Sequence, residues 1–240
     1  VDKTYIQCIN GKDFHRYKFL QEPKMYLSYG EWLAEPRFSA PFFDDEKIIV
    51  RQTADSIIAH IDYKKRIALN NVYIIGRLKE KFNIKYLLGI LNSKLLENIY
   101  QFIAQEKGRT YPEVKKPYLN NLPIKNCDEI TQNDIAKKVD TIISKNKEKK
   151  AKKDIFLEML KCDLNLNKIK KLSNFEELTW IEFKHELESQ NIFLKGDKKD
   201  DWFKRFTNYT NEINEFQEQI NKNEEQINNK VDELYNSSEG

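Results

Sequence analysis

The sequence predicts an α+β protein, in which a mixed α/β domain is followed by a long-helix, antiparallel coiled-coil-like region. Three observations predict this class. Short runs rich in β-branched and aromatic residues alternate with turn residues up to about residue 75. Apolar residues then recur at helical spacing over residues 85–105, and from about residue 130 helix formers replace the strand signals. These changes place the two domains at residues 1–125 and 126–240.

The first half contains strand-like runs that are bounded by turn residues such as Asn10-Gly11. The predicted strands cover residues 5–9, 25–29, 47–51, 56–61 and 71–75. The helix predicted at residues 85–105 carries its apolar residues on one face, so we expect it to pack on the sheet. A glycine-hinged basic loop follows, and residues 122–124 (LPI) close the domain because proline ends regular structure.

Helices are predicted throughout the second half. Thr131 is the predicted N-cap of the first helix, whose apolar stripe runs from Ile135 to Leu160. We expect the lysine-rich run at residues 144–153 to be a solvated section or tip of this helix, with phosphate binding as the alternative. A shorter helix is predicted at residues 175–187.

The last helix has a heptad-like apolar pattern. Its apolar residues from Phe206 to Leu234 follow at spacings of 3, 4, 3, 4, 7, 4 and 3, with one position skipped near Asn223. A single helix of this kind cannot bury its own apolar seam. The helix of residues 130–160, returning antiparallel, is the economical partner, and another subunit is the alternative.

Charge is distributed unevenly along the chain. Residues 1–125 contain 21 Lys and Arg against 14 Asp and Glu, whereas residues 126–240 contain 20 against 24. A basic first half is typical of a protein that meets a polyanion such as DNA or RNA, although a solvated basic face would give the same count. The hydrophobic content of 40% and aromatic content of 12% indicate a folded chain.

Cysteine and histidine spacing indicates no metal site. The chain has three of each, all scattered, and no Cys-x-x-Cys pair. We therefore expect reduced thiols in a cytoplasmic protein. No apolar run has the length of a membrane span and no signal-peptide pattern occurs, so we expect no membrane partner. Because the chain starts at Val1 without methionine, we expect it to be a fragment of a longer protein.

Motifs for catalysis are missing from the sequence. It has no phosphate-binding glycine-rich loop, no serine-nucleophile elbow, and no Pro-Pro pair of the kind that adenine amino-methyltransferases use to hold a flipped base. Asp13 with residues 22–24, and residues 44–47, resemble the acidic sets of Mg²⁺-dependent nucleases, but such sets arise by chance in a chain with 33% charged residues. We expect no catalytic residue, metal site or cofactor here.

Candidate DNA contacts lie in three places. Arg51 and Gln52 end a predicted strand and can make bidentate contacts to guanine and adenine edges, although Arg51 could instead pair with Asp55 or cap a turn. The glycine-hinged loop offers a guanidinium fork that suits phosphate or guanine. A further phosphate candidate is Arg37. The predicted DNA-binding residues are Arg37, Arg51, Gln52, Lys107, Arg109, Thr110, Lys115 and Lys116.

Several segments of the first half occur in an order and spacing that point to a family. They are NGKDFHRY at residues 10–17, WLAEPR at 32–37, KIIVRQT at 47–53, LNNVY at 69–73, LGILNSKL at 88–95 and LPI at 122–124. Together, residues 1–125 resemble the TaqI-like C-terminal specificity domain, the target recognition part of restriction-modification enzymes. The tail, ending VDELY at residues 231–235, is similar to the helical region that closes many single-chain type IIG enzymes and to the spacer helices of type I specificity subunits.

The resemblance implies sequence-specific recognition of duplex DNA by a non-catalytic part of a larger protein, with the domain in the major groove. An adenine N6-methyltransferase that uses S-adenosylmethionine, and any nuclease that uses Mg²⁺, would precede it in the parent chain or belong to a partner subunit. Base-contacting residues differ between family members, so Arg51, Gln52, Arg109, Lys115 and Lys116 carry over only as positions in the expected region. Two other functions stay open: a helical protein-interaction module for subunit assembly, and a Mg²⁺-dependent nuclease.

Overall fold

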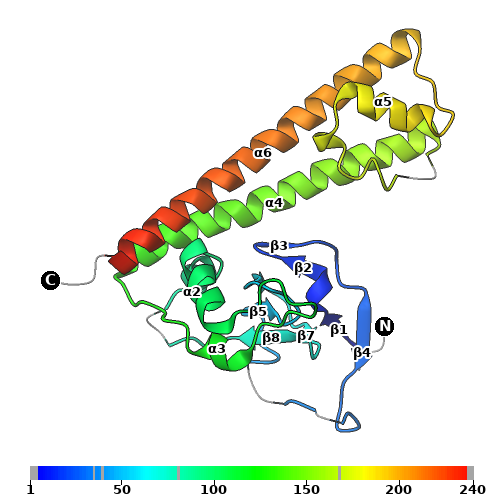
Figure 1. Ribbon diagram of the computed structural model, residues 1–240. Coiled ribbons are helices and arrows are strands. Elements are labelled where there is room, and N and C mark those ends of the chain that lie inside the picture. The colour runs from blue at the N-terminus through cyan, green and yellow to red at the C-terminus, as the bar shows by residue number, and fades with distance from the viewer. Residues whose placement is uncertain (1–4, 35, 39–40, 80–81, 167–168, 237–240) are drawn as a thin grey trace. The chain divides into compact units, whose positions relative to one another are not determined.

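The computed structural model describes residues 5–34, 36–38, 41–79, 82–166 and 169–236. Its strands and helices confirm the predicted α+β class (Figure 1). The chain divides into two compact units: unit 1 comprises residues 1–143 and 223–240, and unit 2 comprises residues 144–222. The long helices α4 (Glu129–Leu164) and α6 (Gly196–Asn236) contribute to both units. The domain boundary at residue 125 stays a prediction.

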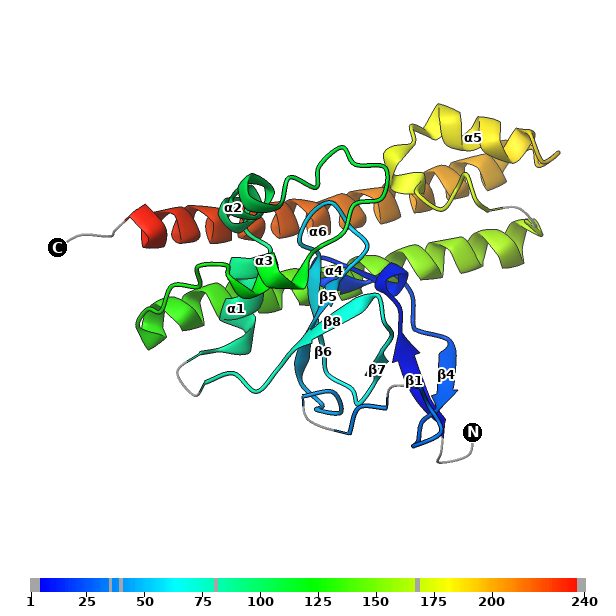
Figure 2. The same cartoon turned by 60° about the horizontal axis from the view of Figure 1, so that its bottom comes forward.

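The described part of unit 1 contains three small β-sheets with the strand orders β4-β1-β7, β2-β3 and β6-β5-β8. The strands are β1 (Tyr5–Ile9), β2 (Phe14–His15), β3 (Lys18–Phe19), β4 (Met25–Ser28), β5 (Lys47–Arg51), β6 (Ala59–Asp62), β7 (Ile67–Ala68) and β8 (Val72–Ile75). Strand β5 lies between β6 and β8 and pairs antiparallel with both, as Figure 2 shows. Its first four residues are buried, so the strand delivers only its last residue, Arg51, to the edge of the core.

The five predicted strands are confirmed, with β5 at the predicted residues and β6 starting later than predicted, at Ala59. The prediction missed β2, β3 and β7. Each of these has only two residues. A two-residue strand is too short to show an alternating pattern, so only its pairing partner reveals it.

The prediction of one helix over residues 85–105 is wrong, because the segment forms two helices, α1 (Ile84–Leu91) and α2 (Lys94–Ala104). Ser93 caps α2 by accepting a hydrogen bond at Oγ from the Leu96 amide, at 3.3 Å. The side-chain amide of Asn92 bonds both backbone groups of Ala59 in β6, at 3.1 and 3.0 Å. These side-chain bonds join the turn between the two helices to a distant strand, and α1 packs on β5 and β6.

Helix α1 also contacts the parts of α4 and α6 that belong to unit 1. A Cβ atom on Gly89 would lie 2.7 Å from Cγ2 of Ile135 in α4, which shows how closely the helices approach. The ammonium of Lys85 pairs with Asp140 of α4 at 2.8 Å. The first residue of α2, Lys94, donates its amide to Asn228 of α6 at 2.9 Å. Unit 1 therefore combines the sheets with the first part of α4 and the last part of α6.

Helix α4 begins earlier than predicted, and Thr131 is not its N-cap. The carboxylate of Asp128 accepts hydrogen bonds from the Thr131 amide at 2.9 Å and from its hydroxyl at 2.7 Å. The ionised carboxylate thus satisfies an amide at the start of the helix, and the Thr131 hydroxyl acts as a donor. This cap lowers the pKa of Asp128.

In unit 2, α6 runs antiparallel to α4, which confirms the predicted return. Lys152 of α4 pairs with Glu212 at 2.5 Å, whereas the earlier Lys149 bonds the later Gln217 at 2.7 Å. Two further elements, η2 (Phe175–Glu177) and α5 (Trp180–Glu188), pack there on an aromatic core (Figure 1). The core includes Phe156, Phe175, Phe183, Trp202 and Phe206. The lysine-rich run is a section of α4, as expected, with ion pairs that include Lys150–Asp154 at 2.7 Å.

Candidate nucleic-acid interface

Arg51 lies at the end of β5, and its guanidinium packs against Phe14 of the same unit. Its Nη2 donates to the carbonyl oxygen of Phe14, and its Cζ lies 5.8 Å from the centre of the Phe14 ring. Burial lowers the pKa of this guanidinium. Among the described residues, Arg51 makes no ion pair with Asp55. A base contact from Arg51 would therefore compete with its hydrogen bond to Phe14.

Gln52 joins the end of β5 to two other segments through its backbone. Its amide donates to the carbonyl of Asn71 at 3.0 Å, and its carbonyl accepts from the Val114 amide at 2.7 Å. Val114 is fully buried. The structure thus brings the Arg51–Gln52 corner and the segment around Val114 together, although they are far apart in the sequence.

The segment between α2 and α3 (Lys116–Asn120), residues 105–115, is termed the basic loop. Glu106 lies near the start of this loop in the sequence, and its side chain is only 1% exposed. The Glu106 carboxylate lies 3.1 Å from Nη1 of Arg109 and 3.0 Å from Nζ of Lys115, and it accepts from the Glu113 amide at 3.3 Å. Two predicted DNA contacts are therefore also internal supports of the loop.

Two further features determine the path of the basic loop. Gly108 has φ +85°, a left-handed conformation that glycine adopts without strain. The Tyr100 hydroxyl in α2 accepts from the Lys115 amide at 2.9 Å. The backbone after the loop apex is therefore held by α2, and Gly108 turns the chain before the apex.

The apex of the basic loop faces solvent. Lys107, Thr110 and Tyr111 are exposed, and Tyr111 is 87% exposed. Among the described residues, none forms an ion pair with Lys107. A held backbone that presents a free cation and an aromatic ring to water has the composition of a nucleic-acid contact surface.

The structure places Arg37 and Lys116 at one cavity of about 210 Å³. The cavity is lined by Arg37, Pro41, Phe42, Val72, Tyr73, Ile74, Ile75, Lys116, Leu119 and Asn120. The backbone of Arg37 is tied to the Tyr29 hydroxyl, which accepts from the Arg37 amide at 2.6 Å and donates to its carbonyl at 3.0 Å. Two cations from distant segments thus line one hollow of mixed polar and apolar surface, and one of them, Lys116, begins the helix that follows the basic loop.

The acidic sets that resembled a nuclease site have structural partners. Asp13 accepts from the Asn10 amide at 2.8 Å and from the Gln21 side chain at 2.9 Å. Glu22 pairs with Arg66 at 2.5 Å, and Lys47 is buried against Asp62 at 3.3 Å. Among the described residues, no group of three or more His, Cys, Asp and Glu side chains could hold a metal ion.

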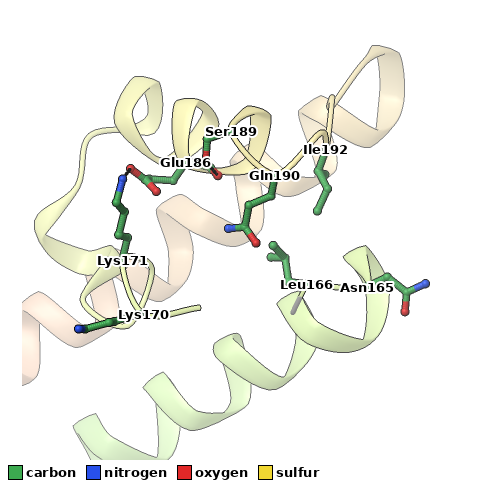
Figure 3. A pocket seen from close by; sticks show the side chains of 8 residues that line it. All are labelled: Asn165, Leu166, Lys170, Lys171, Glu186, Ser189, Gln190 and Ile192. Atoms are coloured by element: carbon green, nitrogen blue, oxygen red, sulfur yellow. Dashed lines mark hydrogen bonds and ion pairs between the residues drawn. The ribbon is translucent and has the colours of Figure 1, made fainter. Parts of the chain in front are cut away.

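Unit 2 has a cavity of about 490 Å³ between the end of α4 and α5 (Figure 3). Lys171 and Glu186 lie on its wall and pair at 3.0 Å, so their charges neutralise each other. Leu166, Gln190 and Ile192 complete much of the lining. Ser189 also lines the cavity, and its hydroxyl donates to the backbone carbonyl of Glu186 at 2.8 Å, so no described side chain is placed to act on it as a base.

Sequence reasoning missed Glu106 and Tyr111. A carboxylate followed by cations three and nine positions later was a signal for Glu106. In a chain this rich in charge, however, such spacing predicts no ion pair until the loop folds back. Tyr111 lies between two predicted contacts, but exposure is a property of the tertiary fold.

Comparisons with known proteins agree with this geometry. Residues 6–124 match the family model of the TaqI-like C-terminal specificity domain, so this part of the chain belongs to that family of target-recognition domains. A domain of this class recognises DNA sequence in a restriction-modification system. Residues 128–231 match a domain of unknown function (DUF8810). No match was found among curated proteins, and no helix in the described part of the chain is long and apolar enough to cross a membrane.

The ion pairs of Glu106 make the basic loop sensitive to pH. The hydrogen bond from Lys115 holds the pKa of the Glu106 carboxyl below its ordinary value of 4.5. A lowered pKa stabilises the fold above the ordinary value, and this stabilisation is lost as the pH falls through the folded pKa. Glu106→Gln is expected to reduce the protection of the Val114 and Lys115 amides against hydrogen exchange at pH 7.

The matched control is Glu113→Gln, a substitution of an exposed carboxylate in the same loop. It should leave the protection of both amides unchanged. The difference between wild type and Glu106→Gln should disappear only as the pH falls through the lowered pKa of folded Glu106, because the wild-type carboxylate then becomes neutral as well. A difference that persisted in acid, or an equal effect of Glu113→Gln, would refute the role of the Glu106 charge.

Proposed function

We propose that this chain reads a specific duplex DNA sequence as the specificity part of a restriction-modification methyltransferase or endonuclease. The observation that carries the proposal is the basic loop, held against the end of β5 within the segment that matches the TaqI-like specificity domain. Phosphate contacts from exposed cations would supply affinity. Base-edge contacts from the Arg51–Gln52 corner would supply specificity.

The exposed cations divide into two groups by their internal bonds. Lys107 and Lys116 are exposed, and no described residue forms an ion pair with either. Arg109 and Lys115 share Glu106, so each has part of its charge already neutralised. We assign phosphate contacts first to Lys107, Lys116 and Arg37, and a mainly structural role to the other pair.

We assign the second part of the chain, about residues 126–240, to a helical spacer of a type IIG enzyme or a type I specificity subunit. Antiparallel packing of α4 and α6 supports this assignment, because two long paired helices make a stiff connection. The catalytic partner would be a methyltransferase domain of the same parent chain or of another subunit. S-adenosylmethionine, and Mg²⁺ if the parent cleaves DNA, would bind in that catalytic part.

A protein-interaction module has weaker support than DNA recognition. Central residues of the α6 seam are already buried within each unit: Ile213 lies in the core of unit 2, and Ile227 and Val231 are buried in unit 1. The seam therefore needs no second subunit to cover it. The nuclease alternative has no candidate metal cluster among the described residues.

Binding of duplex DNA is expected to weaken steeply as salt rises. Each neutralised phosphate contributes a slope of about −0.9 to log K against log salt. Lys107→Ala should reduce this slope by about 1 and weaken binding to a selected duplex and to a scrambled duplex equally, because a phosphate contact carries no sequence information. Fluorescence anisotropy with labelled duplexes at several salt concentrations measures both quantities.

Lys65→Ala is the matched control, since it removes the same charge from the surface of unit 1. Lys65 pairs with Asp45 near the start of β5, at the opposite end of that strand from Gln52. Its slope and affinity should equal those of the wild type. Wild-type affinity that did not change between low and high salt would contradict the proposed function itself.

A further inference from the structure

Tyr111 is not one of the predicted DNA contacts, but its position in the loop is unusual. Its side chain is 87% exposed at the apex of the basic loop, and among the described residues none makes a hydrogen bond or ring contact with it. A large aromatic side chain left in water contributes nothing to the core of its own domain. Aromatic residues in such positions are enriched where a partner covers them.

The loop presents this ring at a defined place. On one side of Tyr111, Arg109 is tied to Glu106 at 3.1 Å, and on the other side Val114 is buried and bonded to Gln52 at 2.7 Å. Between them, Pro112 has a fixed φ. Binding through the ring would therefore order little additional backbone, which favours affinity.

The surroundings of the ring indicate the chemistry of its partner. Lys107, Arg109 and Thr110 precede it, and Lys115 and Lys116 follow, so the cations outnumber the one exposed carboxylate nearby, Glu113. A purely apolar partner surface would have to desolvate these charges without compensation. Nucleic acid provides both phosphates for the cations and flat base faces for an aromatic ring.

We propose that Tyr111 stacks its ring on a base of the bound duplex, at a step that the protein partly unstacks. This inference rests on the proposed function and adds a contact made by shape and stacking to the base-edge contacts of the Arg51–Gln52 corner. Such a wedge selects steps that unstack easily, so it contributes specificity without a hydrogen bond to a base edge.

The test uses the full chain and a 30-base-pair duplex selected by the wild-type protein from a random pool. Tyr111→Ala is expected to weaken binding by about 5- to 150-fold, the range for removal of one aromatic–base stack. Tyr111→Phe keeps the ring and should bind within about twofold of wild type. The salt slope should be unchanged in both variants, because neither removes a charge.

Phe102→Ala is the matched control, since Phe102 in α2 is similarly exposed, at 85%, and lies outside the basic loop. It should bind as wild type does. 2-Aminopurine placed at successive positions of the duplex should change its fluorescence at one step with wild type and Tyr111→Phe, and not with Tyr111→Ala.

Three results would overturn the stacking role. Equal binding by Tyr111→Ala and wild type would mean that the ring serves another partner, such as a protein surface. Equal losses in Tyr111→Ala and Tyr111→Phe would mean that the hydroxyl, and not the ring, makes the contact. An equal loss in Phe102→Ala would mean a non-specific effect of apolar surface. If the wild type selects no duplex at all, the proposed function fails together with the inference, whereas the other results leave that function intact.

Discussion

Asp62→Ala is expected to lower the free energy of unfolding by about 3–5 kcal/mol, the usual cost of removing one partner from a buried ion pair. The Asp62 side chain is 0% exposed. It lies 3.3 Å from Nζ of Lys47 and 2.7 Å from Nη1 of Arg66, whose side chains are 0% and 4% exposed. The substitution would leave both cations in the interior without their shared carboxylate.

Arg66 keeps its ion pair with Glu22 at 2.5 Å, so most of this loss falls on Lys47. Lys47 also donates to the carbonyls of Asp44 and Lys64, at 2.7 and 3.0 Å, but carbonyls carry no full charge. Burial already lowers the pKa of Lys47, and the Asp62 charge opposes that shift. Without Asp62, the pKa of Lys47 should fall further, so the variant should regain stability relative to wild type as the pH rises through this lowered pKa.

Urea unfolding of the full chain, followed by circular dichroism, measures the change, with Asp45→Ala as the control. Asp45 pairs with Lys65 at 3.5 Å, and both side chains are largely exposed, at 67% and 71%. An exposed pair contributes at most about 1 kcal/mol, so Asp45→Ala should unfold nearly as wild type does. Equal midpoints for the two variants would show that the buried pair contributes no more than the exposed one.

The second large effect is expected at Gly89, where α1 meets α4 and α6 in unit 1. Gly89→Leu should destabilise the protein by about 3 kcal/mol, the upper part of the range for overpacking a core. Even a Cβ atom would lie 2.7 Å from Cγ2 of Ile135 and 3.2 Å from Cγ2 of Val139. Both contacts are methyl groups on β-branched side chains, which cannot rotate away freely in a helix.

A double-mutant cycle separates this clash from the general effect of the substitution. Gly89→Ala should gain up to about 1 kcal/mol in helix propensity and lose it through the clash with Ile135. Ile135→Ala alone should cost about 2–5 kcal/mol as a cavity. The double variant should be more stable than the sum of the single effects predicts, because Ile135→Ala removes the methyl group that the new Cβ would meet. Strict additivity would mean that the two positions are not in contact.

These two sites matter for function because each supports one side of the candidate interface. The Asp62 network lies at the start of β5, and the Arg51–Gln52 corner lies at its end. Helix α1 leads directly into α2 and the basic loop. Variants at Asp62 or Gly89 should therefore lose DNA binding in proportion to unfolded protein, whereas Lys107→Ala and Tyr111→Ala should lose it while folded.

Local sequence patterns predicted the class of the fold and much of its strand content. The run at residues 47–51 formed β5 at those residues, because a short β-branched run needs only neighbours on both sides to become a buried strand. The apolar spacing of the last helix predicted its burial, and α4 covers it as expected in unit 2. Motif order alone identified the specificity domain that the family model matches at residues 6–124.

Contacts between residues far apart in the sequence determined the features that local patterns did not predict. At the break between α1 and α2, the Asn92 side chain bonds to Ala59, a contact that no local spacing encodes. Arg109 and Lys115 are held by Glu106, and Arg51 by the Phe14 carbonyl, so the charge that each offers to DNA depends on its internal partners.

The sequence by itself determined that this protein folds as α+β, carries a basic first half and contains the motifs of the TaqI-like specificity domain within residues 6–124. Only the tertiary structure decided which cations are free, that Arg37 and Lys116 line one cavity, and that Tyr111 is presented to solvent. The physical reason is the separation along the sequence over which each effect acts. Periodicity acts between residues a few positions apart, whereas ion pairing and exposure depend on side chains that meet only after the chain has folded.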